Sequence, residues 1–201
     1  MLWRLPINGW GSIVWFVSGG LVNLIRAPFA KNVKDNKITH SREQGLDKIL
    51  LVLVVLGGTL IPILHLTTGG LSFANFHPPS WLPATGVALL IPGLWLFWRS
   101  HADLGKNWSV TTELREDHTL ITSGVYEHIR HPMYAAILLL CLAQPFLIHN
   151  WIAGLAGPLS FIPMLLLRRN YEEQMMIDEF GDRYREYALR TGRILPKLNS
   201  Q

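Results

Sequence analysis

Residues 49–68, with the sequence ILLVLVVLGGTLIPILHLTT, decide the fold class because none of them is acidic or basic. They open a longer run, 49–98, in which no Asp, Glu, Lys or Arg occurs, and the stretches 5–25 and 132–167 are equally free of these residues. A helix needs about 20 apolar residues to cross the hydrocarbon core of a bilayer, and water-soluble proteins have no use for such segments. The sequence therefore predicts an all-α, multi-pass integral membrane protein.

Turn-forming residues divide these runs into five predicted transmembrane helices. The connection 69–80 contains paired glycines and prolines, and His149-Asn150 divides 132–167 into a hairpin of two helices. A secretory signal peptide is the alternative for the first run, but no basic cluster precedes it and no clear cleavage site follows, which favours a true span. The predicted spans are 5–25, 49–68, 81–98, about 133–148 and about 151–167.

The distribution of Lys and Arg predicts how these helices are oriented. The segments 26–48, 99–131 and 168–201 hold six, four and seven of these residues, whereas the two other connections hold none. Because basic loops stay on the cytoplasmic side, five spans place the N-terminus outside and the C-terminus in the cytoplasm. The net charge of +4 then follows from membrane orientation, and a nucleic-acid partner has no support.

This pattern also predicts two halves of different content. Residues 1–98 hold three transmembrane helices, and 99–201 hold a cytoplasmic segment (99–131), the helical hairpin (132–167) and a tail (168–201). The single cysteine, Cys141, excludes a disulfide framework and a multi-cysteine zinc site, and no metal is expected. The sequence carries no signal for an oligomeric state.

Polar residues on both sides of the hairpin form the candidate site. Pro132 suits the first turn of a helix, so His131 is predicted beside unpaired backbone N–H groups at a helix start, a place that favours a carboxylate or phosphate. In the tail, Arg168 and Glu172 stand four residues apart and share a helix face. Arginines at that place are also typical membrane anchors. The residues by themselves indicate only a five-span protein with a polar site that suits an anion.

The tail is predicted to be helical over 167–180, with a break at Gly181 and a second short helix through Tyr187. That second helix is expected to lie against the membrane surface, with Tyr184 and Tyr187 at the interface.

Several motifs in order resemble the isoprenylcysteine carboxyl methyltransferase family, whose wider relatives include the membrane phospholipid N-methyltransferases. Upstream, Leu104 to Trp108 and His118 to Ile121 are similar to the family's approach to its motif. The resemblance covers roughly residues 99–197. Its motifs are Ser123-Gly124-Val125-Tyr126, Arg130-His131-Pro132-x-Tyr134, the hairpin, Glu172-Glu173, Phe180-Gly181, Tyr184-x-x-Tyr187 and Pro196.

The resemblance implies an S-adenosylmethionine-dependent methyltransferase without a Rossmann domain, with its cofactor between the fourth and fifth helices. It implies Arg168 as the substrate-binding residue, with His131 and Glu172 as further catalytic candidates. The roles of Arg130, Glu173, Tyr184 and Tyr187 are left open. The implied cofactor contacts are His118, Thr119, Leu120, Ile121, Tyr126, His131, Pro132, Met133, Tyr134 and Glu172.

The acceptor favoured by the resemblance is the carboxylate of a prenylated cysteine, a lipophilic substrate that enters from the bilayer beside membrane lipid. A phospholipid amine and a small hydrophobic thiol, acid or terpenoid are the alternatives. A membrane sterol reductase that binds NADPH has a similar tail, but Gly-Val-Tyr before Arg-His-Pro resembles the methyltransferases better. A transporter or scaffold is least favoured, because few polar groups lie within the spans to build a solute path.

Overall fold

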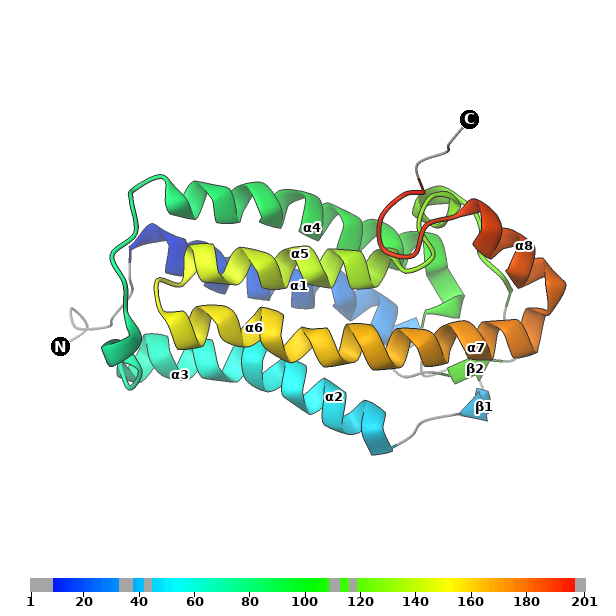
Figure 1. The fold of residues 1–201 in the computed structure, drawn as a ribbon, viewed down its shortest axis with the longest axis horizontal. Coiled ribbons are helices and arrows are strands. Elements are labelled where there is room, and N and C mark those ends of the chain that lie inside the picture. The colour runs from blue at the N-terminus through cyan, green and yellow to red at the C-terminus, as the bar shows by residue number, and fades with distance from the viewer. Residues whose placement is uncertain (1–8, 33–37, 42–44, 109–112, 116–118, 198–201) are drawn as a thin grey trace.

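The computed structural model describes residues 9–32, 38–41, 45–108, 113–115 and 119–197. Long helices lie side by side, and two shorter helices with a pair of strands lie at one end (Figure 1). The elements are α1 (Trp10–Asn32), β1 (Ile38–Ser41), α2 (Gly45–Val55), the π-turn η3 (Leu56–Leu60), α3 (Ile61–Thr68), η4 (Ser72–Ala74), α4 (Leu82–Leu104), η5 (Gly105–Asn107), β2 (Glu113–Arg115), η6 (Gly124–Glu127), α5 (Pro132–Leu147), α6 (Trp151–Pro163), the π-turn η7 (Met164–Arg168), α7 (Arg169–Phe180) and α8 (Asp182–Arg190).

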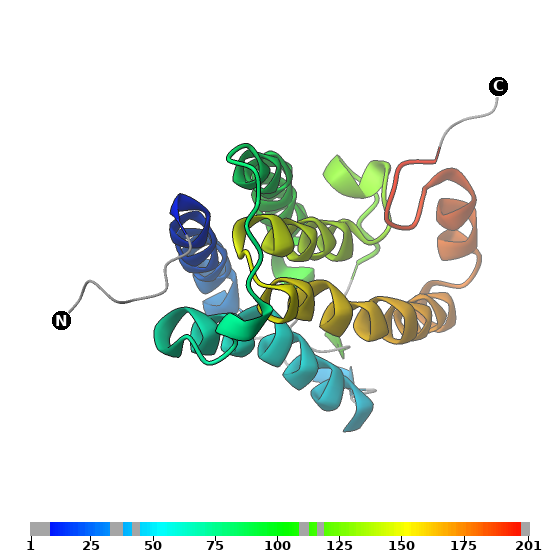
Figure 2. The ribbon, with the colours of Figure 1, turned by 60° about the vertical axis from the view of Figure 1, so that its left-hand side comes forward.

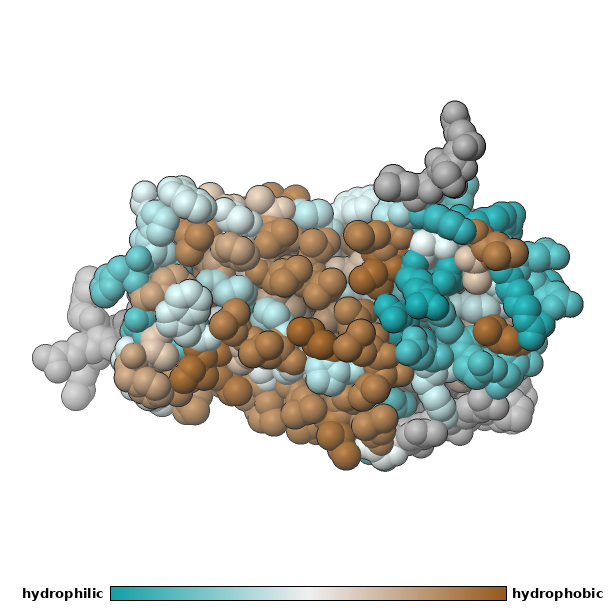
Figure 3. Space-filling view, viewed as in Figure 1, coloured by the Kyte–Doolittle hydropathy of each residue, from teal (hydrophilic) through white to brown (hydrophobic). Residues whose placement is uncertain are grey.

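Within these residues, four helices are long and apolar enough to cross a membrane: Trp10–Ala30, Gly45–Thr68, Leu82–Leu104 and Trp151–Phe180. The chain is an integral, multi-pass membrane protein. Figure 3 shows apolar residues over the helices and hydrophilic residues gathered at the end that holds α7 and α8. The fourth predicted span corresponds to α5, whose 16 residues fall short of the length a span needs, so the count of five stays a prediction.

Among the residues that the structure describes, the fold is helical apart from one short antiparallel pair of strands, which the all-α prediction did not include. Strand β1 pairs with β2, with Ile38 opposite Arg115 and Ser41 opposite Glu113. The pair joins the connection after α1 to the connection after α4. It lies at the same end of the bundle as α7 and α8 (Figure 1).

Helix α5 lies in the middle of the bundle, between α4 and α6 (Figure 1), and α1 also packs against it. Glycines on α4 allow its closest approach. A Cβ on Gly86 would clash with the Leu147 side chain, and one on Gly93 would crowd Leu139 and Leu140. The hairpin turns at Asn150, whose side-chain oxygen accepts from the backbone N–H groups of Ile152 and Ala153 and so caps α6.

The π-turn η3 joins α2 and α3 into one continuous helix and packs closely on α6. A Cβ on Gly57 would clash with the Ala156 carbonyl oxygen and with Ser160. The Gln144 amide of α5 donates to the Gly57 carbonyl oxygen at 3.1 Å and to that of Ala153 at 2.7 Å. The glycine therefore lets three helices meet without leaving the buried amide of Gln144 unsatisfied.

The tail follows the predicted pattern of two helices but not the predicted placement of its tyrosines. Helix α7 ends at Gly181, whose φ of +55° is a left-handed conformation that favours glycine, and α8 then runs along a different direction. Figure 2 shows α8 on the opposite side of the molecule from α1. The expectation that Tyr184 and Tyr187 lie at the membrane interface is wrong. Both are 3% exposed, because α8 turns them inward onto the cavity described below.

Candidate active site

A cavity of about 770 Å³ lies inside the bundle and reaches its polar end. Its walls include residues of every helix from α1 to α8 except α6 and of the turns η3, η5, η6 and η7, and they combine a long apolar part with a smaller charged part. His118 lies outside the described residues, and Glu173 does not line the cavity. The predicted site residues that do line it are Thr119, Leu120, Ile121, Tyr126, Arg130, His131, Pro132, Met133, Tyr134, Arg168, Glu172, Tyr184 and Tyr187.

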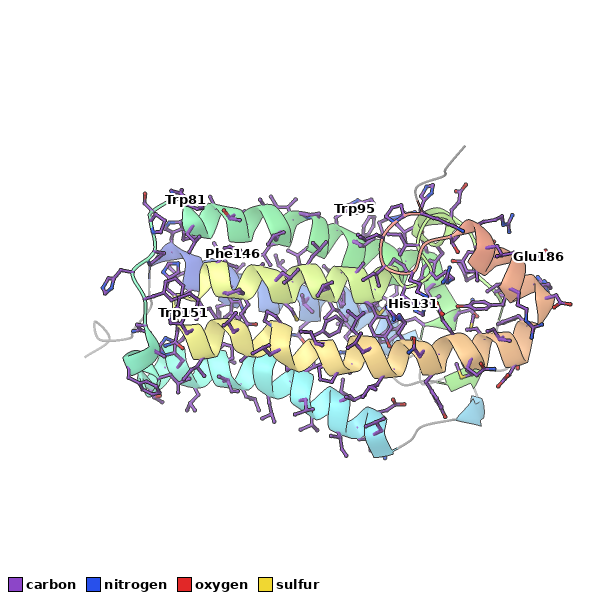
Figure 4. The ribbon with its side chains drawn as sticks, viewed as in Figure 1. Trp81, Trp95, His131, Phe146, Trp151 and Glu186 are labelled. Carbon is purple, nitrogen blue, oxygen red and sulfur yellow. The ribbon has the colours of Figure 1, made fainter. Side chains whose placement is uncertain are left out.

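Glu172 is the centre of the charged part. Its Oε1 accepts from the Arg168 Nε at 3.0 Å and from the Tyr134 hydroxyl at 2.9 Å. Its Oε2 lies 3.8 Å from the Nδ1 of His131. Pro132 starts α5 directly after His131, so the imidazole stands at a helix N-terminus, as the sequence predicts. Figure 4 shows His131 at the end of the bundle opposite Trp81 and Trp151.

Glu173 lies behind His131, on the side away from the cavity. Its Oε1 is 3.2 Å from the His131 Nε2 and accepts from the Arg130 Nε at 3.1 Å. Its Oε2 is 3.5 Å from the Arg193 Nε. The two ring nitrogens of His131 therefore face two different carboxylates, Glu172 on the cavity side and Glu173 on the other.

The last described segment of the chain, 188–197, holds this arrangement from outside, and we call it the strap. The backbone N–H groups of Arg130 and His131 donate to the carbonyl oxygens of Gly192 and Arg193 at 2.8 and 2.9 Å. The Arg130 guanidinium also donates to the carbonyl oxygen of Ala188 at 2.8 Å. Gly192 is required here, because a Cβ would clash with the backbone of Leu195.

Buried tyrosines connect α8 to η6 and α4. The Tyr187 hydroxyl donates to the Tyr126 carbonyl oxygen at 2.6 Å, and the Tyr126 hydroxyl donates to that of Ser100 at 3.3 Å. Burial raises the pKa of Tyr187 to about 12, although Arg130 and Thr191 act in the opposite direction. Burial also raises the pKa of Tyr126 and of Tyr184 well above the ordinary value of a phenol. All three hydroxyls are therefore protonated at neutral pH, and those of Tyr126 and Tyr187 act as donors.

Sequence reasoning named Leu104 to Trp108 only as part of the family resemblance, and it missed the contributions of α1 and α4 to the site. The Asn107 side chain donates to the Thr119 hydroxyl at 3.1 Å and accepts from the Thr119 backbone at 3.2 Å, which fixes the start of the described 119–121 segment. Trp108 is buried, and the Arg26 guanidinium lies 5.5 Å from the centre of its ring. The available signal was the polar pair His101 and Asn107 at the end of an apolar helix.

The fold and the site together define an integral membrane protein with a large apolar cavity closed at one end by a carboxylate, a guanidinium and an imidazole. Residues 86–178 match the model of the isoprenylcysteine carboxyl methyltransferase (ICMT) family. This match confirms the resemblance that the sequence motifs indicate, over nearly half of the chain.

Known proteins of this kind are similar to the chain over most of its length. The mouse protein-S-isoprenylcysteine O-methyltransferase is 25% identical over 199 residues, which cover 94% of this chain and 66% of the mouse protein. The Schizosaccharomyces pombe enzyme of the same name is 27% identical over 66% of this chain and 62% of its own length. Protein-S-isoprenylcysteine O-methyltransferase B of Arabidopsis thaliana is 28% identical, over 70% and 72% of the two chains.

Solved structures with a similar fold are known. One of them is that of the eukaryotic intramembrane Ras methyltransferase ICMT, with a TM-score of 0.53 and 25% identity, covering 79% of this chain and 54% of that one. The chain thus spans about two thirds of the mouse relative and about half of the solved chain.

Proposed function

We propose that this chain is a membrane-embedded, S-adenosylmethionine-dependent methyltransferase that methylates the carboxylate of a lipophilic acceptor such as a prenylated cysteine. One observation carries the proposal. In a chain with the family's motifs, Glu172, Arg168 and His131 meet at the charged end of a cavity that is otherwise apolar. A lipid-modified anion needs both an apolar channel and a fixed cation, and this cavity has the two side by side.

The residues at the charged end fit the proposed cofactor. The cavity volume lies within the range of about 300–1,000 Å³ that is usual for ligand sites. Glu172 suits the ammonium group of the methionyl part, and His131 with the N–H groups at the start of α5 suits its carboxylate. Tyr126 and Tyr134 offer aromatic faces to adenine or to the sulfonium cation. When bound, the cofactor supplies an electrophilic methyl group.

The acceptor is held by Arg168. A guanidinium binds a carboxylate through two parallel hydrogen bonds and so orients one oxygen toward the methyl carbon. A carboxylate acceptor is already ionised at neutral pH and needs no general base. Arg168 and the apolar wall then contribute mainly positioning and partial removal of water. An amine or thiol acceptor would need a base, and His131 and Glu172 are the nearest groups for that role.

The same proposal includes five membrane crossings, with the N-terminus outside and the C-terminus in the cytoplasm. Helix α5 is about 24 Å long at 1.5 Å per residue, shorter than the hydrocarbon core. Because α4, α6 and α1 pack around it, protein rather than lipid covers most of its surface, and a short crossing is tolerated. The Lys and Arg residues in the sequence segments 26–48 and 168–201 support a cytoplasmic location for the charged end.

Calorimetric titration of the purified protein with S-adenosylhomocysteine tests the cofactor part. We expect saturable binding that Glu172→Ala weakens at least about tenfold, because charge-assisted hydrogen bonds contribute about 1.5–3 kcal/mol. Glu179→Ala, on the exposed face of α7, is the matched control and should leave binding unchanged. Binding of NADPH in place of S-adenosylhomocysteine would reject the proposal in favour of a reductase.

Transfer of a labelled methyl group to N-acetyl-S-farnesylcysteine tests the acceptor part. Arg168→Ala is expected to raise the KM for this acceptor. Turnover with a phospholipid amine and none with the farnesylated acid would keep the cofactor assignment and replace the acceptor.

A further inference from the structure

The strap presents apolar side chains to its surroundings. Leu189 and Leu195 are 72% and 73% exposed. Between them, Ile194 packs against Leu96 and Ala135, at the junction of α4 and α5. The strap therefore passes beside the ends of two membrane helices, and Figure 1 shows it curling back over the start of α5.

A polar cleft of about 520 Å³ lies directly beside these leucines, between the strap and the segment 122–128. Two cations of the strap, Arg190 and Lys197, line it, and Lys197 is held in place because its Nζ donates to the Leu189 carbonyl oxygen at 2.6 Å. The other polar groups of the cleft are Thr122, Ser123, Glu127, His128, Tyr187 and Thr191. Cations and hydroxyl donors thus outnumber the single acidic group.

We propose that the strap is a membrane-interface anchor that binds an anionic phospholipid. The headgroup phosphate lies in the cleft between Arg190 and Lys197, where the hydroxyls of Thr122 and Ser123 add hydrogen bonds. Leu189 and Leu195 enter the boundary between headgroups and acyl chains. Basic residues beside exposed leucines are the combination by which protein segments lie on anionic membrane surfaces. The proposal does not depend on methyl transfer, because none of these groups belongs to the Glu172 cluster.

The binding has a consequence for the site. The strap supplies the Gly192 and Arg193 carbonyl oxygens that hold the backbone of Arg130 and His131. A lipid that fixes the strap therefore also fixes these two residues. The anchor thereby links the composition of the surrounding bilayer to the geometry of the charged cluster.

The depth of the strap is measured first. Nitroxide labels are attached to Leu195→Cys and, as a control, to Asp182→Cys at the α7–α8 corner, where the native side chain is 87% exposed. Cys141 is buried in the core and is replaced by Ala in both variants. In nanodiscs of roughly one-third phosphatidylglycerol, we expect the Leu195 label to collide with oxygen and the Asp182 label with a water-soluble nickel chelate. Equal exposure of both labels to the chelate would overturn the anchor.

Lipid preference is measured second, by native mass spectrometry of the full chain titrated with phosphatidylglycerol or phosphatidylcholine. The double variant Arg190→Gln/Lys197→Gln should lose about fivefold in phosphatidylglycerol affinity per cation, while Arg183→Gln on the exposed face of α8 should change nothing. Equal affinity of the wild type for both lipids, or an unchanged double variant, would overturn the headgroup site. Displacement of the lipid by inorganic phosphate at the same concentration would replace the lipid with a free anion and also overturn it.

Discussion

Replacing Glu173 by Ala should destabilise the protein strongly, although Glu173 does not line the cavity. Its carboxylate accepts a hydrogen bond from Arg130, forms an ion pair with Arg193 and faces the Nε2 of His131. The Glu173 and Arg130 side chains are only 14% and 8% exposed, so removing the carboxylate leaves a nearly buried guanidinium without its counter-ion. Breaking such a pair costs about 3–5 kcal/mol.

The lower end of that range applies here, because Arg130 keeps the carbonyl oxygens of Ala188 and Thr191 as acceptors. A loss of about 3 kcal/mol lowers the Tm of a chain of this size by roughly 6–12 °C, at about 2–4 °C per kcal/mol. The assay is thermal unfolding of the detergent-purified protein followed by tryptophan fluorescence. Glu186→Ala, on the exposed face of α8, serves as the control and should shift Tm by less than about 2 °C.

The Glu173→Gln variant distinguishes the contribution of the negative charge from that of the side chain's size and shape. Glu173→Gln keeps one oxygen acceptor for Arg130 but presents an amide donor toward His131, so its Tm should lie between those of the wild type and the Ala variant. Its affinity for S-adenosylhomocysteine should also fall, because His131 loses the carboxylate behind its ring. A Glu173→Ala protein that melts together with the Glu186→Ala control would refute the reasoning, since the three interactions would then contribute nothing to stability.

Two further predictions concern packing and pH. Gly57→Ala should lower the free energy of unfolding by about 1–3 kcal/mol, because its Cβ would clash with the Ala156 backbone. Gly58→Ala has open space around its Cβ and should leave stability nearly unchanged, and thermal unfolding of both variants checks this. The raised pKa of Tyr187 means that its ionisation favours the unfolded chain. The contribution of Tyr187 to the free energy of unfolding is therefore fully present below pH 10 and is lost as the pH rises toward 12. Tyr187→Phe should flatten that part of the Tm-against-pH curve, and an unchanged slope would contradict the assignment.

The membrane class and the main helices follow from the sequence because the signals are local. An uncharged, apolar run of twenty residues is stable in a bilayer as a transmembrane helix, whatever the rest of the chain does. The Arg168–Glu172 pair is also local, since residues four apart on a helix always meet. The turn of the last hairpin at Asn150 is also predictable from local sequence, because a capping residue acts on the helix turns beside it.

The features that sequence reasoning missed depend on partners far along the chain. The π-turn at Gly57 packs against α6 and accepts a hydrogen bond from Gln144, and these partners are about ninety residues away in the sequence. Tyr184 and Tyr187 were expected at the interface because aromatic residues near a charged tail usually lie there. They are buried instead because α8 folds back onto η6, and the hydrogen bond from Tyr187 to Tyr126 joins residues 61 positions apart.

The adjacent glutamates show how one local motif supplies two different parts of the site. Consecutive residues on a helix point about 100° apart, so Glu172 and Glu173 cannot face the same partners. Glu172 faces the cavity with Arg168 and Tyr134, whereas Glu173 faces the strap with Arg130 and Arg193. His131 lies between them and touches both. Variants of Glu172 should therefore change ligand affinity first, and variants of Glu173 should change stability first, although the two residues are neighbours in one motif.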